Sequence, residues 1–102
     1  MIANGADINT KNNYGESVLH GATNFNNIEV MELFIAKGIN VNIKDKYGKT
    51  PLYVASEYNE IEKIKFLIAN GANVNIKDIY DETPLHIAYQ KNNIEAIKLL
   101  DY

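Results

Sequence analysis

Residues 45–77 read DKYGKTPLYVASEYNEIEKIKFLIANGANVNIK, and this stretch decides the fold because the chain on either side repeats it. A shift of 33 residues in either direction lays the sequence over itself without a gap. Between Gly5 and Glu29, nine columns are then identical in all three copies: Gly5/Gly38/Gly71, Asn9/Asn42/Asn75, Lys11/Lys44/Lys77, Tyr14/Tyr47/Tyr80, Leu19/Leu52/Leu85, Ala22/Ala55/Ala88, Asn26/Asn59/Asn92, Ile28/Ile61/Ile94 and Glu29/Glu62/Glu95. A fixed period of this length indicates a stacked repeat architecture.

Each unit predicts a tight turn followed by two short helices. Residues 45–48 begin with Asp and end with Gly, as type I turns prefer. Thr50-Pro51 supplies an N-cap hydroxyl and a proline at the first helical position. Asn59 and Gly71 belong to the residue types that end helices in the left-handed conformation, and Asp81, which replaces the turn glycine in the third copy, tolerates that conformation. The sequence therefore predicts an all-α solenoid of antiparallel helix pairs joined by hairpin-like loops.

The second helix of each unit carries an apolar stripe. In the middle copy its residues are spaced by three and four, so they share one face, and Glu62 in the first turn complements the helix dipole. The stripes are Ile28, Met31, Phe34 and Ile35; Ile61, Ile64, Leu67 and Ile68; and Ile94, Ile97 and Leu100. We expect each stripe to face the stack.

The chain resembles the ankyrin-repeat family over essentially its whole length. Residues 83–88 read TPLHIA and match the family signature T-P-L-H-x-A, and residues 71–75 read GANVN, similar to the family's GADVN. Tyr53 replaces the motif histidine in the second unit, and Val18 and Gly21 weaken the first helix of the first unit. We expect amide exchange to be fastest between Ser17 and Phe25.

The resemblance predicts a single ankyrin-repeat domain over residues 1–102. Residues 1–5 align with 67–71, the end of a helix and its stop, so we expect a fragment of a longer array with another repeat encoded directly upstream. The expected divisions are the end of a preceding repeat with its connecting arm (1–11), repeat 1 (12–44), repeat 2 (45–77) and a truncated repeat 3 (78–102).

Composition argues against several functional classes. The net charge is −3 and the basic residues are 10 lysines without an arginine. Nucleic-acid binding is not expected, because affinity for phosphate backbones comes from clustered Lys and Arg. The chain has no Cys, no run approaching the roughly 20 apolar residues of a spanning helix and no signal region. We predict an intracellular, cytoplasmic protein without membrane insertion; secretion within a larger protein stays an alternative.

No motif predicts catalysis, a cofactor or a metal site. His20 and His86 are the only histidines, and no Ser-His-Asp set, Cys nucleophile or phosphate-binding Gly loop accompanies them. The resemblance implies that these imidazoles tie neighbouring repeats together. It also implies that the Asn9, Asn42 and Asn75 column braces successive turns; hydroxylation of this asparagine is the alternative.

Tyr14, Tyr47 and Tyr80 form the column with the strongest functional interpretation, because ankyrin-repeat proteins bind partners with their turn tips and the inner face of their first helices. Exposed tyrosines often dominate interface energetics. The alternative is that repeat duplication copied a tyrosine whose ring lies over neighbouring lysine stems. The repeated Lys11, Lys44 and Lys77 fit a solvated, mixed surface better than a basic ladder.

We therefore predict a non-catalytic module that binds another protein. The candidate partner-binding residues are Tyr14, Phe25, Lys46, Tyr47, Lys49, Glu57, Tyr58, Ile79, Tyr80 and Lys91. Lys44, Lys46 and Lys49 give the middle tip a positive character that favours an acidic partner. Two alternatives remain: a structural spacer in a longer array whose binding or catalytic site lies elsewhere, and weak self-association through uncapped ends.

Overall fold

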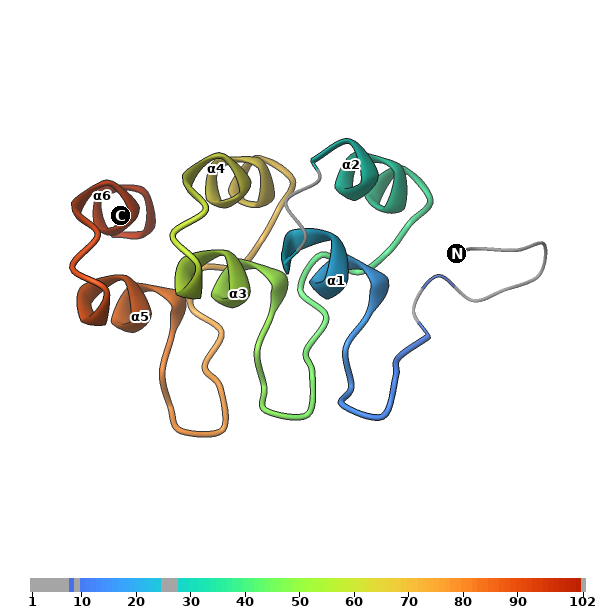
Figure 1. Cartoon of the computed structure of the whole chain (residues 1–102), viewed down its shortest axis with the longest axis horizontal. Helices are drawn as coiled ribbons and strands as arrows, with labels where there is room; N and C mark the ends of the chain where they lie inside the picture. Colours follow the sequence, from blue (N-terminus) through green and yellow to red (C-terminus); the bar gives the residue numbers. More distant parts are fainter. Residues whose placement is uncertain (1–7, 9, 25–27, 102) are drawn as a thin grey trace.

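The chain folds into two parallel rows of helices with hairpin loops projecting from one row (Figure 1). The structure, a computed structural model, describes residues 8, 10–24 and 28–101. The helices are α1 (Val18–Asn24), α2 (Ile28–Ala36), α3 (Pro51–Glu57), α4 (Ile61–Ala69), α5 (Pro84–Gln90) and α6 (Ile94–Leu100). Helices α1, α3 and α5 form the row that carries the hairpins, and α2, α4 and α6 form the other. The described residues contain no strand, which confirms the predicted all-α fold.

The starts of the hairpin-row helices follow the predicted capping chemistry. The Thr50 hydroxyl accepts a hydrogen bond from the N–H of Tyr53 (3.2 Å), and the Thr83 hydroxyl accepts one from His86 (3.3 Å). Proline occupies the first helical position of α3 and α5. Ser17 caps α1 in the same way although no proline follows it. A cap hydroxyl satisfies an otherwise unpaired N–H, and this fixes where each helix begins.

The predicted helix stops also occur at the expected residues. Asn59 and Asn92 follow the C-caps of α3 and α5 and have φ values of +56° and +55°. Gly38 and Gly71, after α2 and α4, have φ values of +92° and +93°. A left-handed residue reverses the chain and ends the helix. Asn26 lies outside the described residues.

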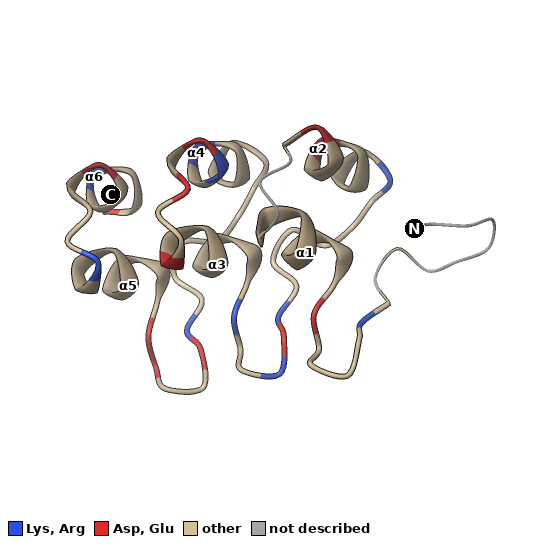
Figure 2. Ribbon diagram, viewed as in Figure 1, with Lys and Arg blue, Asp and Glu red and all other residues tan. Residues whose placement is uncertain are grey.

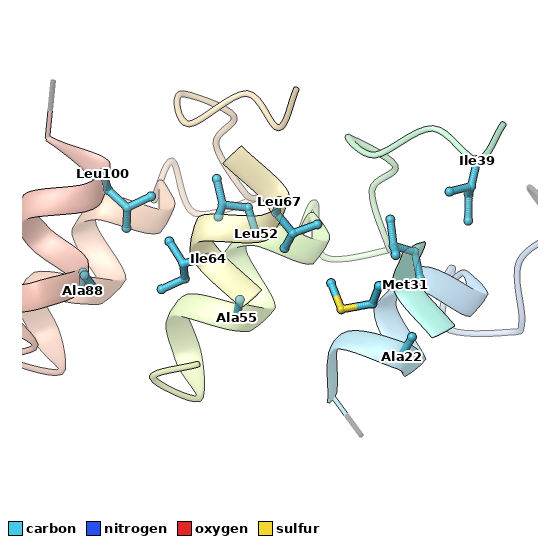
Figure 3. Close-up of a cluster of buried hydrophobic side chains, with 11 residues drawn as sticks. Ala22, Met31, Ile39, Leu52, Ala55, Ile64, Leu67, Ala88 and Leu100 are labelled. Atoms are coloured by element: carbon cyan, nitrogen blue, oxygen red, sulfur yellow. The ribbon is translucent and has the colours of Figure 1, made fainter. Parts of the chain in front are cut away.

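The core lies between the two rows of helices and continues from pair to pair. Leu52 of α3 and Ile64 and Leu67 of α4 are at most 1% exposed, and their side chains lie together in Figure 3. Ala55 and Ala88 are fully buried where α3 and α5 contact each other. Their small side chains let the helices approach closely, so the alanine column sets the spacing of the stack.

One member of the predicted stripes lies outside the core. Leu100 is 3% exposed and belongs to the core cluster, but Ile94 is 65% exposed. The equivalent Ile28 and Ile61 are half-buried. Ile94 differs from them because α6 is the last described helix of its row, so no further described helix covers it.

The hairpins are stacked on one another by backbone hydrogen bonds at their tips. The N–H of Lys46 donates to the carbonyl of Tyr14 (2.9 Å), and the N–H of Ile79 donates to the carbonyl of Tyr47 (3.0 Å). The two bonds repeat at the 33-residue period. Since each joins one tip to the next, the three hairpins form one continuous array.

Close stacking explains why the first two hairpins carry glycine beside the tip tyrosine. A Cβ on Gly15 would lie 2.6 Å from the backbone nitrogen of Lys46, and one on Gly48 would lie 2.9 Å from the Cα of Asp78. Both glycines also have positive φ values, which few side chains tolerate. Asp81, the equivalent residue in the third hairpin, adopts a φ of +63° as predicted.

Side chains of the hairpin-row helices tie each pair to the next hairpin. His20 accepts from the N–H of Ser17 through Nδ1, so its Nε2 carries the proton and donates to the carbonyl of Lys49 (2.8 Å). Tyr53 donates its hydroxyl to the buried Oδ2 of Asp78 (2.8 Å). The tie expected of the motif histidine is therefore present at His20, and the tyrosine that departs from the motif makes an equivalent tie.

Asn42 braces neighbouring turns, as the resemblance implies for its column. Asn42 accepts a hydrogen bond from the N–H of Asn73 (2.7 Å), and its amide donates to the carbonyl of Gly71 (3.4 Å). These bonds join the loops that follow α2 and α4. Asn9 is outside the described residues.

Lys63 is a buried cation that the sequence analysis did not single out. Its side chain is 1% exposed, its ammonium donates to the carbonyl of Thr23 at the end of α1, and Glu60 lies 3.8 Å away. Desolvation lowers the pKa of its amine. The corresponding residues of the other units are Val30 and Ala96. Lys63 therefore makes a contact between the first and second helix pairs that the repeat pattern does not contain.

Candidate protein-binding surface

Four predicted site residues with large aromatic or aliphatic side chains lie exposed on the hairpin tips. Tyr14 is 56%, Tyr47 41%, Ile79 58% and Tyr80 73% exposed. The tip-to-tip backbone bonds hold these residues on a common edge of the stack. We call Tyr14, Tyr47 and Tyr80 the tip row. Large apolar rings held in solvent by a rigid backbone are suited to contact a partner.

Lys46 links two members of the tip row. Its ammonium lies 4.9 Å from the ring centre of Tyr14 and 5.1 Å from that of Tyr47. Both distances are within the range of a cation–π interaction. Tyr14 and Tyr47 therefore pack with a neighbouring lysine, as the alternative interpretation of the tyrosine column expects. Tyr80 has no such cation contact among the described residues, although its column is the same.

Lys49 and Glu57 connect the second hairpin to the end of α3. Their charged groups are 3.1 Å apart, and both side chains are a little under one-third exposed. The ammonium also lies 5.9 Å from the ring centre of Tyr47 and 5.5 Å from that of Tyr53. Desolvation opposes the charged form, but the hydrogen bond and charge of Glu57 outweigh it and raise the pKa of Lys49. Lys49 is thus paired within the chain.

The remaining predicted residues lie at the ends of hairpin-row helices. Tyr58 is the C-cap of α3 and is 57% exposed. Lys91 is the C-cap of α5 and is also exposed, and no hydrogen bond or ion pair joins its side chain to the other site residues in the described part of the chain. Phe25 lies outside the described residues. The structure therefore brings together the first two tips and the end of α3.

A hollow between α1 and α3 adjoins this surface. It has a volume of about 210 Å³, and Gly21, Val54, Glu57 and Tyr58 are among the residues that line it. Asp45 also lines the hollow, although its position in the sequence predicts only the first residue of a turn. The signal that could have found the hollow is Gly21, which stands in a column where the other units have larger side chains.

Charges of both signs occur on every hairpin (Figure 2). Lys44 and Lys46 flank Asp45 in the second hairpin, whereas Asp81 and Glu82 follow the third tip. The mixed pattern agrees with the expected solvated surface. Preference for an acidic partner at the middle tip stays a prediction, and Lys49 contributes less to it because Glu57 pairs with it.

The described side chains offer recognition by rings and charges. No group of three His, Asp or Glu residues within the described ranges is arranged to hold a metal ion. None of α1–α6 has the length and apolar character needed to cross a bilayer. What the surface presents to another molecule is aromatic area, ammonium groups and carboxylates.

Comparison with known families gives two matches along the chain. Residues 1–78 match the family model described as ankyrin repeats (3 copies), and residues 80–101 match the model described as ankyrin repeat. A search of curated proteins finds no match. The two family matches together cover both the hairpin tips and the helices that carry the site residues.

Proposed function

Because the chain belongs to the ankyrin-repeat family, we propose that it is a non-catalytic module that binds a partner protein through its hairpin tips and the inner face of α1, α3 and α5. Ankyrin repeats are generally protein–protein interaction modules and are typically non-catalytic. The partner contacts the tip row first, with Lys46, Glu57 and Tyr58 beside it. Shape and side-chain complementarity supply the affinity.

The tip row is the observation that carries this proposal. Its rings remain 41–73% exposed although the backbone beneath them is fixed by tip-to-tip hydrogen bonds. Rigid aromatic side chains lose little conformational entropy when they bind, so more of their contact energy appears as affinity. Tyr47 lies at the middle of the row and is the expected centre of the interface.

Replacing Tyr47 with alanine tests the proposal. The chain is immobilised and incubated with lysate of its native host, and retained proteins are identified by mass spectrometry. A protein held by the native chain is then purified, and its dissociation constant is measured by titration. The loss of a central interface tyrosine is expected to cost about 2 kcal/mol or more, or at least roughly 30-fold in affinity.

Leu33→Ala is the matched control, because Leu33 is a large apolar residue, 51% exposed, on α2 in the other row. It should leave the affinity unchanged. The urea midpoint of Tyr47→Ala should move little, since the ring's two cation contacts, with Lys46 and Lys49, are at the surface. Equal binding by both variants would contradict the proposal. Failure to retain any protein specifically would favour a structural spacer within a longer array.

A further inference from the structure

The hollow between α1 and α3 exists because Gly21 has no side chain. An ideal Cβ at this position would meet no atom within 4 Å, whereas the equivalent residues are Val54 and Ile87. The hollow has a volume of about 210 Å³, which is below the roughly 300–1,000 Å³ of small-molecule sites. The hollow is therefore the size of a side chain rather than of a cofactor.

The first unit also lacks a bond that the other two units make across this face. Lys49 bonds to Glu57 at 3.1 Å, and Gln90 donates to Glu82 at 2.6 Å, so each hairpin arm is joined to the helix residue eight positions away. The equivalent pair is Glu16 and Asn24, and both line the hollow. Within the described residues no hydrogen bond joins these two side chains.

The hollow has a negative lining. Glu16, Asp45 and Glu57 contribute carboxylates, while Lys49 is the one ammonium and already pairs with Glu57. Asp45 accepts two backbone hydrogen bonds through Oδ1, and Glu16 accepts one from an asparagine through Oε1. No described donor bonds to the second oxygen of either Asp45 or Glu16.

His20 does not offset this charge. It is 3% exposed, and its Nε2 already bonds to the carbonyl of Lys49. Desolvation lowers its pKa, so the ring is neutral at pH 7. Tyr58 adds an exposed aromatic face to the same lining.

We propose that this hollow receives an arginine side chain of the partner protein, with its guanidinium between Glu16 and Asp45 and its plane against the Tyr58 ring. This inference rests on the proposed function and assigns the chemistry of one partner residue. A guanidinium fits because it donates several hydrogen bonds in a plane and stacks on aromatic rings, whereas an ammonium does not stack in this way. The chain itself contains no arginine, so a second copy cannot supply the group.

The test uses nuclear magnetic resonance of the whole 15N-labelled chain. It is titrated with the peptide acetyl-Ala-Arg-Ala-amide, and with the same peptide carrying citrulline, which has nearly the shape of arginine without its charge. We expect saturable shifts of the Gly21, Asp45 and Glu57 amides at millimolar arginine peptide. The citrulline peptide should produce none at these positions.

Two variants assign the response to the hollow. Gly21→Val restores the side chain found at Val54 and should abolish the saturable shifts. Glu16→Gln removes one charge, keeps the acceptor for its asparagine neighbour, and should weaken binding about two- to fivefold, the range for a partly exposed ion pair. Equal shifts by the citrulline peptide, or unchanged binding by Gly21→Val, would overturn the proposal.

Two further titrations complete the test. A lysine peptide that binds as tightly as the arginine peptide would also overturn the assignment, because a second copy of the chain could then fill the hollow. Tyr47→Ala should bind the arginine peptide normally, since Tyr47 does not line the hollow. A failed titration therefore leaves the tip-row proposal standing, and a failed tip-row test leaves the hollow standing.

Discussion

Tyr53→Phe should destabilise the stack by removing a single hydroxyl. That hydroxyl donates to Oδ2 of Asp78 at 2.8 Å, and both residues are buried, at 4% and 6% exposure. The ring and its packing remain in the variant. Hydrogen bonds to charged groups contribute about 1.5–3 kcal/mol. Asp78 keeps two backbone bonds to Oδ1, so we expect a loss of about 1.5–2 kcal/mol, near the lower end of that range.

Urea unfolding followed by circular dichroism measures this loss. For a domain of this size, 1.5–2 kcal/mol corresponds to a fall in melting temperature of roughly 6–16 °C. Tyr58→Phe is the matched control, because Tyr58 is 57% exposed. It should change the free energy of unfolding by less than about 0.5 kcal/mol.

The pH dependence identifies the bond responsible. Desolvation opposes ionisation of Asp78, but hydrogen bonds from the Glu82 N–H and the Tyr53 hydroxyl outweigh it and lower its pKa. A lowered carboxyl pKa stabilises the fold above the unfolded value of about 3.9, and this contribution is lost as the pH falls through the folded value. The difference in free energy of unfolding between the native chain and Tyr53→Phe should therefore reach its full size at pH 7 and become smaller below about pH 4. A Tyr53→Phe variant as stable as Tyr58→Phe at pH 7, or a difference independent of pH, would refute the reasoning.

Three more variants or measurements test other features of the stack. Gly48→Ala should lower the free energy of unfolding in urea by more than about 1 kcal/mol, because the new Cβ would lie 2.9 Å from the Cα of Asp78 and the residue has a positive φ. Asp81→Gly should change the free energy of unfolding by less than about 1 kcal/mol. Similar losses in both variants would contradict the close stacking of the hairpins. The lowered pKa of Lys63 in the folded state should make the native chain gain stability relative to Lys63→Met as the pH rises towards the unfolded lysine value of about 10.4, because the folded amine loses its proton first. A stability difference that stays constant with pH would argue against a desolvated amine. Hydrogen exchange should be faster in α1, which contains Gly21 and no proline, than in α3, and the reverse order would contradict the prediction.

The sequence predicted the features that depend on neighbouring residues. Thr50 and Pro51 start α3, and Asn59 ends it, because capping and left-handed backbone are determined within a few positions. The 33-residue period then carried each local prediction to the equivalent positions of the other units. The tip row was predicted by the same logic, since Tyr47 lies in a turn whose geometry its flanking residues specify.

Among the features that join different repeats, the His20 tie and the Asn42 brace were implied by the family resemblance, whereas the Lys63 contact and the hollow were not predicted. The Lys63 ammonium donates to the carbonyl of Thr23, 40 residues away in the sequence. The equivalent residues of the other units are valine and alanine, so the repeat pattern does not predict this contact. The hollow at Gly21 needs α3 beside α1 and an acidic hairpin beside both. Each depends on how two repeats meet, and the period alone does not contain this information.

Three departures from the repeat, at Gly21, Tyr53 and Lys63, lie where helix pairs meet, and this gives them a common physical role. Lys63 binds the second helix pair to the end of α1, and Tyr53 binds it to the third hairpin. Gly21 instead removes contact between the first and second pairs. The shared columns make any two units stack, whereas these residues make each junction different. The second pair is therefore held by specific bonds on both sides, and the hollow at Gly21 leaves part of its junction with the first pair open, beside the surface where we place the partner.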